Sequence, residues 1–210
     1  MKAGRPRRTI LRGTEADTLE LDGTLPASAR SHVPAPLEIP EGPVRVNVLF
    51  FAMRGLALRG VPWPTFDYQE ALWRIAVQLD GVPAWFAIAC DLDHASIRAL
   101  GRRIVRYPTR VARFERRWSV EASGGTLSTR VIEEAQSPEP VPAQRTFVRD
   151  GTCVYEIPWE EIAAPERHAA SVEVLCDSLS ERTFGERVTW ASSGLVHRGR
   201  IHMCGVARRV

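Results

Sequence analysis

The segment ALGRRIVRYPTR, residues 99–110, carries four arginines in twelve positions. The planar guanidinium of arginine donates two parallel hydrogen bonds to a carboxylate, so this segment suits a small organic acid held in a pocket. A nucleic-acid surface needs basic residues clustered without acids, and four acidic residues lie nearby: Asp91, Asp93, Glu115 and Glu121. We therefore expect no nucleic-acid partner. Two interpretations stay open, namely arginines lining a ligand pocket and arginines on a solvated helix face paired with those acids.

Glu70 is the second residue whose type and place could do chemistry. In the strand-like segment YQEALWRIAVQL the odd positions from Trp73 to Leu79 are apolar. The even positions form a mixed, largely polar face, made of Tyr68, Glu70, Leu72, Arg74 and Gln78. A buried carboxyl group has a raised pKa, which suits general acid–base catalysis. The alternative is a surface ion pair between Glu70 and Arg74 across the pleat.

Lysine, histidine and cysteine, which serve covalent and metal chemistry, are sparse or scattered. Of the 28 basic residues only Lys2 is a lysine, and an imine with a carbonyl substrate needs an amine such as that of lysine. His197, His202 and Cys204 match no metal-ligand spacing. The sequence also lacks a glycine-rich phosphate loop and a G-x-S-x-G elbow. It therefore predicts neither a metal site nor a cofactor.

The composition is that of a globular protein. The chain has 210 residues, 44% of them hydrophobic and 25% charged, and a net charge of only +3. No apolar run approaches the ~18 residues that cross a bilayer, and the basic start lacks the apolar centre of a secretion signal. The cysteines are widely spaced, which predicts buried free thiols at Cys90, Cys153, Cys176 and Cys204. We expect a cytoplasmic protein without a membrane partner.

The chain organisation follows from the same patterns. Residues 1–24 are polar and aperiodic, which predicts a flexible N-terminal arm before a single domain over residues 25–210. In that domain alternation predicts strands at 44–53, 68–79 and 83–90, and further strands flank glycine turns at 124–125 and 150–151. Many short strands with few helices indicate a mostly β fold that is closed or wrapped around itself.

Three segments are expected to be helical. The clearest covers residues 91–105, with Asp91 or Asp93 as the cap and Tyr107-Pro108 as the end. A short helix is expected near residues 27–32, and one or two helical turns within residues 159–170.

Seven short segments follow one another over residues 25–120: VPAPLEI, EGPVRV, YQE, DG, LDH, GRR and RYPTR. Their order and spacing resemble the acetoacetate decarboxylase-like superfamily, with its V-P-x-P-L-E-I, Y-x-E, L-D-N, G-R-E and Y-P-K-K segments. The resemblance is closest to a bacterial branch without the Schiff-base lysine. It implies a mostly antiparallel β fold with a few short helices, shaped as a cone-like barrel with an interior pocket. By analogy with relatives it also implies a homo-oligomer.

The resemblance gives the candidate residues a place. It directs the even face of residues 68–78 into the barrel, with Glu70 at the family's active-site glutamate and Arg102 at the arginine of G-R-E. The two lysines of Y-P-K-K, however, are Thr109 and Arg110 here. Threonine cannot form an imine, and a guanidinium stays protonated and is not a nucleophile. The chain is therefore not expected to be a Schiff-base acetoacetate decarboxylase.

Three functions fit these expectations. The first is binding of a small organic acid, keto or carboxylic, in the barrel interior by Arg110, Arg102, Tyr68 and Arg74. The second is a lyase, hydratase or isomerase type of enzyme, with catalytic residues Glu70, Thr109 and Tyr107. In it Glu70 is the general acid or base. The third is a structural scaffold for oligomers.

Overall fold

The computed structural model describes residues 9–13, 15–58, 60–61, 64–136, 145–163 and 166–210. Its strands are β1 (Thr9–Arg12), β2 (Glu15–Leu25), β3 (Val44–Leu58), β4 (Phe66–Leu79), β5 (Val82–Leu92), β6 (Thr109–Arg116), β7 (Ser119–Ala122), β8 (Gly125–Gln136), β9 (Arg145–Asp150), β10 (Cys153–Ile157), β11 (Trp159–Ala163), β12 (Glu166–Asp177), β13 (Thr189–Gly205) and β14 (Arg208–Arg209). The helical elements are η1 (Ala27–His32), α1 (Ala95–Leu100), the π-helix η2 (Gly101–Val105) and α2 (Leu179–Phe184). The predicted mostly β fold with a few short helices is confirmed.

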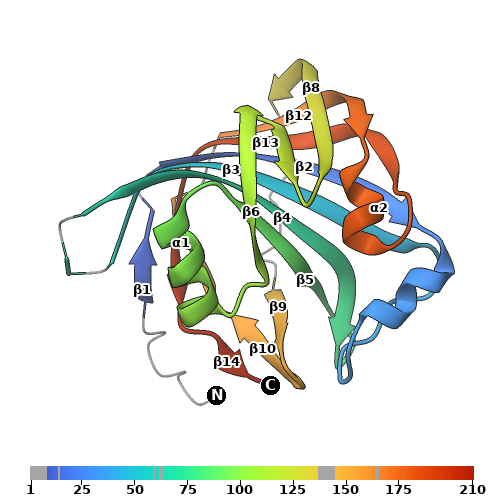
Figure 1. Cartoon of the computed structure of the whole chain (residues 1–210), viewed down its shortest axis with the longest axis horizontal. Coiled ribbons are helices and arrows are strands. Elements are labelled where there is room, and N and C mark those ends of the chain that lie inside the picture. The colour runs from blue at the N-terminus through green and yellow to red at the C-terminus, as the bar shows by residue number, and fades with distance from the viewer. Residues whose placement is uncertain (1–8, 14, 59, 62–63, 137–144, 164–165) are drawn as a thin grey trace.

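Nine of the strands close into a ring (Figure 1). The ring runs β2, β3, β4, β5, β6, β7, β8, β12, β13 and back to β2. Its pairs are antiparallel except β5 with β6, and β5 also pairs in parallel with β9 outside the ring. The ring is therefore barrel-like but not a regular antiparallel barrel, because β5 divides its edge between two partners.

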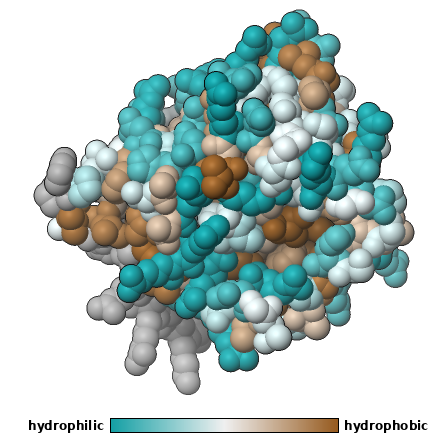
Figure 2. All heavy atoms as spheres, in the orientation of Figure 1, coloured by the Kyte–Doolittle hydropathy of each residue, from teal (hydrophilic) through white to brown (hydrophobic). Residues whose placement is uncertain are grey.

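The central strands are buried on both faces. Along β3 the even residues Val46, Val48 and Phe50 belong to a cluster inside the ring. The odd residues Leu49 and Phe51 belong to a second cluster. The second cluster packs β3, β4 and β5 against α1, η2 and β1, which lie together at the lower left of Figure 1. On the face drawn in Figure 2 hydrophilic residues cover most of the surface, and hydrophobic ones show in a few separate groups, one of them in a recess right of centre.

The two faces of β4 alternate as predicted, but the odd face, not the even face, points into the ring. Trp73 and Ile75, on the odd face, fill the ring interior. Tyr68, Glu70 and Leu72, on the even face, lie on the side of the second cluster. The expectation that the even face lines the inside of the ring is therefore wrong. Alternation separates the two faces of a strand, but it does not say which face a closed ring encloses when both are buried.

Residues 15–24, predicted to be part of a flexible arm, form β2 in the middle of the sheet. β2 pairs with β3 along its whole length and with β13. Its acidic residues have basic partners from distant parts of the chain: Asp17 accepts a hydrogen bond from Arg117 in the β6–β7 turn (2.9 Å), and Glu20 lies 3.5 Å from Arg74 in β4. The charges that make the segment look like an arm are thus compensated only in the folded chain. Residues 1–8 lie outside the described residues.

The helical predictions are correct in part. The short helix is found as η1, and residues 95–105 are helical as α1 and η2. Neither predicted cap is one, because His94 precedes α1 and makes no side-chain capping bond. The segment 159–170 forms parts of β11 and β12 in its described residues, since pairing with β13 overrides its weak helical pattern.

All four cysteines are free, as predicted, but only Cys90 and Cys204 are buried, whereas Cys153 is half-buried and Cys176 is exposed. No helix in the described part of the chain is long and apolar enough to cross a membrane.

Candidate functional site

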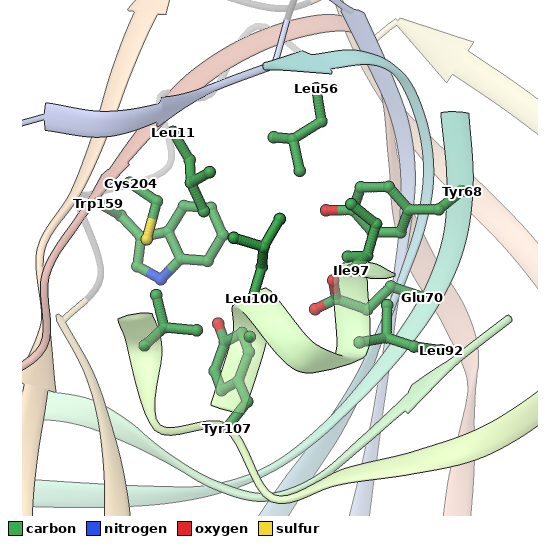
Figure 3. Close-up of a pocket in the computed structure, with 12 residues that line it drawn as sticks. Leu11, Leu56, Tyr68, Glu70, Leu92, Ile97, Leu100, Tyr107, Trp159 and Cys204 are labelled. Carbon is green, nitrogen blue, oxygen red and sulfur yellow. The ribbon is translucent and has the colours of Figure 1, made fainter. Parts of the chain in front are cut away.

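A pocket lies in the second cluster, between the even face of β4 and the helical segment α1–η2 (Figure 3). Two short strands that are far apart in the sequence close it, because β1 and β11 both pair with the last residues of β13. It offers about 40 Å³ to the centres of water-sized molecules. Its lining consists of Leu11, Leu56, Tyr68, Glu70, Leu92, Ile97, Leu100, Gly101, Val105, Tyr107, Trp159 and Cys204.

Three polar side chains reach into this apolar pocket: Tyr68, Glu70 and Tyr107. The Tyr68 and Tyr107 hydroxyls and the Glu70 carboxyl all point toward the space between them in Figure 3. Glu70 Oε1 and the Tyr107 hydroxyl are fully buried and have no hydrogen-bond partner among the described residues. A buried polar atom without a partner costs stability, so these two atoms mark where a bound molecule or water would make hydrogen bonds.

Burial raises the pKa of Glu70 to about 7. Hydrogen bonds from the Cys90 thiol and the Tyr68 hydroxyl, and the charge of Arg74, lower this pKa without cancelling the desolvation. Burial and the charge of Glu70 raise the pKa of both Tyr68 and Tyr107. Near neutral pH Glu70 can therefore be acid or carboxylate, whereas the two tyrosines keep their protons and act as hydrogen-bond donors.

Arg74 and Arg110, predicted to bind the ligand, do not line this pocket. Arg74 donates to Asn47 Oδ1 from Nε (3.1 Å) and Nη2 (2.6 Å), and its guanidinium lies 4.7 Å from the centre of the Trp85 ring. Glu70 and Arg74 are both buried, at 4% and 3% exposure, so the alternative of a surface pair between them is wrong. Arg110 donates two hydrogen bonds to Asp91, from Nε to Oδ1 (2.6 Å) and from Nη2 to Oδ2 (2.7 Å). The expected pairing with a neighbouring acid is therefore found for Arg110, but in strand β6 and with a buried partner, not on a solvated helix face.

Arg102 and Thr109 are brought together, but beside the pocket. Arg102 donates from Nε to Thr109 Oγ1 and from Nη2 to the Thr109 carbonyl, both at 2.7 Å. Thr109 is buried behind Gly101, which forms part of the pocket wall. Of the seven residues predicted for the site, Tyr68, Glu70 and Tyr107 converge on the pocket, and the other four are held by protein partners.

The apolar residues that line the pocket were not predicted from the sequence to be part of a site. Leu11 and Trp159 come from segments predicted as an arm and as helical turns, and Leu56 lies beyond the strand predicted over residues 44–53. Trp159 stacks on Phe51 with ring centroids 6.3 Å apart. No local pattern could reveal these residues, because they meet only through the pairing of β1 and β11 with β13.

The pocket carries no cation in its described lining, which contains neither arginine, lysine nor histidine. Among the described residues no three His, Cys, Asp or Glu side chains gather as a metal ion would require. The polar groups in the lining are therefore one carboxyl group, two phenol hydroxyls, the thiol of Cys204 and the indole N–H of Trp159.

No family model and no curated protein matches the sequence. Solved structures do match its fold. Acetoacetate decarboxylase from Legionella pneumophila superposes with a TM-score of 0.66 at 15% identity, over 100% of this chain and 92% of that one. An acetoacetate decarboxylase-like enzyme from Sphingomonas wittichii RW1 gives 0.66 at 16% identity, over 96% and 93%. The enduracididine biosynthesis enzyme MppR gives 0.69 at 12% identity, over 99% and 91%. The chain has the acetoacetate decarboxylase-like fold.

Proposed function

We propose that the pocket binds a small carboxylic or keto acid without a covalent bond, and that the acid shares one proton with Glu70. The observation that carries the proposal is the Glu70 carboxyl group, which is buried and has an unpartnered oxygen beside two tyrosine hydroxyls. This placement supports part of the predicted function, the binding of a small organic acid, but moves it from the arginines to Tyr68, Glu70 and Tyr107.

The shared proton follows from charge. An anion in an apolar pocket needs a compensating positive charge or a hydrogen-bond donor. The described lining offers no positive charge. The protonated form of Glu70 offers a strong donor, and the Tyr107 hydroxyl offers a second. The Tyr68 hydroxyl offers a third when it turns from Glu70 to the ligand. A carboxylate therefore fits the site when Glu70 is neutral and is repelled when Glu70 is ionised.

The size of the pocket sets the class of ligand. A space of about 40 Å³ corresponds to about three water molecules at ~10–15 Å³ each. That space suits acids of a few heavy atoms. One structural neighbour, MppR, is known in complex with pyruvate, a molecule of this class. Pyruvate and butyrate are therefore the first ligands to test.

Affinity measured against pH tests the proposal. Glu70 has a pKa of about 7, whereas a free carboxylic acid ionises near ~4.3. Between these values the ligand is an anion and Glu70 is protonated, so butyrate affinity should be highest there. Above pH 7 it should fall by up to about tenfold per pH unit as Glu70 loses its proton. Isothermal titration calorimetry from pH 5 to pH 9 measures this profile.

Glu70→Gln should flatten that profile, since the amide donates a hydrogen bond at every pH and carries no charge. Glu121→Gln is the matched control, because Glu121 is an exposed residue of β7 far in sequence from the pocket residues of β4. It should keep the wild-type profile. Butyrate affinity that rises above pH 7, or a Glu70→Gln profile equal to that of the wild type, would refute the shared proton.

Borohydride trapping tests the absence of imine chemistry. No lysine lies in the pocket lining, and the sequence has a single lysine at position 2. Acetoacetate with sodium borohydride should therefore leave the mass of the protein unchanged, except at Lys2 or the amino terminus. Peptide mass spectrometry locates any adduct. A reduced adduct within residues 9–210 would contradict the expectation.

A second candidate function is general acid–base catalysis on a neutral carbonyl compound. It is favoured by the pKa of Glu70, about 7, which lets the same carboxyl group accept and return a proton near neutral pH. Tyr68 and Tyr107 would donate hydrogen bonds to the oxygen of an enolate. The two candidates have opposite pH dependence, because anion binding needs the acid form of Glu70 and proton abstraction needs the carboxylate.

A further inference from the structure

The segment between Gly101 and Thr109 forms a closed loop that carries Tyr107. Its closure is made by Arg102, whose guanidinium spans Thr109 Oγ1 and the Thr109 carbonyl at 2.7 Å each. Backbone bonds from the Tyr107 amide to the Gly101 carbonyl (3.2 Å) and from the Thr109 amide to the Tyr107 carbonyl (2.8 Å) complete it. The loop therefore joins the π-helix η2 to the start of β6.

Close packing supports the same closure. A β-carbon added to Gly101 would lie 3.3 Å from Thr109 Cγ2, which is tighter than ordinary contact. The glycine thus lets η2 approach β6 closely enough for Arg102 to reach Thr109. Arg106, at the end of η2, has a left-handed backbone conformation (φ 61°) that turns the chain back toward β6. Pro108 is anchored separately, because its carbonyl accepts a bond from the Cys90 amide (3.2 Å).

Tyr107 itself lacks an anchor at its tip. Its hydroxyl is buried and has no hydrogen-bond partner among the described residues. Figure 3 shows the ring rising from the loop below the pocket, with the hydroxyl on the side of Trp159 and Cys204. The position of this hydroxyl therefore depends on the backbone that carries the ring.

We propose that Arg102 and Thr109 are positioning residues: their two hydrogen bonds hold the loop that presents the Tyr107 hydroxyl to the pocket. This deepens the proposed function and rests on it for any effect on ligand binding. The effect on Tyr107 itself is independent of a ligand. At these two positions the side chains act on the pocket through the backbone, without lining it.

The chain has three tyrosines, so protein labelled with 3-fluorotyrosine gives three ¹⁹F resonances, which single Tyr→Phe variants assign. Arg102→Leu removes both hydrogen bonds and should shift and broaden the Tyr107 resonance. Thr109→Val removes only the Oγ1 acceptor at nearly constant volume and should have a smaller effect. Thr109→Ser keeps the acceptor and should restore a spectrum close to wild type.

Arg103→Leu is the matched control. Arg103 is an exposed neighbour in the same π-helix, so the variant loses the same charge without touching the loop closure. It should leave the Tyr107 resonance in place. An unchanged Tyr107 resonance in Arg102→Leu, or an equal change in Arg103→Leu, would overturn the proposal. Circular dichroism of each variant confirms that the fold is kept. Should Arg102→Leu fail to fold, Thr109→Val against Thr109→Ser decides.

Butyrate affinity is the second readout. Arg102→Leu loses both hydrogen bonds that hold the loop and should weaken butyrate binding about tenfold. Thr109→Val loses only the bond to Oγ1 and should weaken it about threefold. Thr109→Ser should bind as the wild type does. If neither the wild type nor any variant binds butyrate, but the Tyr107 resonance changes as described, the proposed function fails and the positioning role stands. Binding that is equal in all variants, with an unchanged resonance, refutes the positioning role alone.

Discussion

Replacing Glu70 with glutamine is expected, under the second candidate function, to slow deuterium exchange at the α-carbons of butanone by about 100-fold or more. This is the usual contribution of a positioned general base. Butanone is small, neutral and keeps its carbonyl oxygen free for the hydroxyls of Tyr68 and Tyr107. The Glu70 carboxylate would take a proton from the α-carbon, leaving an enolate, and a deuteron would return to the same carbon. Proton NMR in deuterated buffer follows the loss of signal.

The exchange rate should depend on pH in a defined direction. Burial raises the pKa of Glu70 to about 7, so the carboxylate form that this candidate function requires appears as the pH rises through that value. Exchange catalysed by the wild type should therefore increase toward pH 8 and level off above it, once the buffer rate is subtracted. Glu121→Gln, with its exposed carboxyl group removed, should match the wild type. Exchange no faster than in buffer, or exchange retained in Glu70→Gln, would rule out the enzyme candidate.

Arg110→Leu is expected to lower the free energy of unfolding by about 3 kcal/mol, at the lower end of the cost of breaking a buried ion pair. Asp91 is fully buried and accepts bonds from Arg110 and from the Trp73 indole (2.7 Å). Leucine leaves its carboxylate without a cation in the protein interior. Arg110 is 22% exposed, and for this reason we place the effect at the lower end. The arginine also donates to Thr183 in α2 (3.0 Å).

For a chain of this length such a loss lowers the melting temperature by about 6–12 °C, at 2–4 °C per kcal/mol. Arg130→Leu is the control, because it breaks an exposed pair with Glu173 and should cost about 1 kcal/mol or less. Urea unfolding measures both variants. Butyrate affinity of the folded Arg110→Leu protein should stay that of the wild type. A stable variant with greatly weakened binding would instead restore Arg110 to the ligand site.

Local patterns predicted the parts of the site that lie on one strand or one turn. Tyr68 and Glu70 share a face because strands alternate, and the end of the helical segment before Tyr107-Pro108 follows from the restriction that proline places on its neighbour. These are properties of a few adjacent residues, so a sequence can show them. These local properties do not show which side chain holds the segment in place, and the hydrogen bonds between Arg102 and Thr109 were not predicted.

Other features depend on partners that are distant in the chain. β2 looks like an arm because its acids find their arginines only across the sheet. Part of the apolar wall comes from β1, β3 and β11. These strands are brought together because β1 and β11 both pair with the end of β13 and β1 also pairs with β3. Of the three arginines expected to bind a ligand, Arg110 and Arg74 are instead paired with Asp91 and Glu20, since a buried guanidinium needs an acid beside it. Arg102 is held by Thr109.

By itself the sequence determined the mostly β fold, the alternating strand that carries Glu70, and the absence of a lysine at positions 109 and 110. These depend on residue type and short-range spacing. Only the tertiary structure decided which face of that strand the ring encloses, which polar groups remain without partners, and therefore which residues are free to bind a ligand. The physical reason is that burial and charge compensation are set by contacts between strands far apart in the chain.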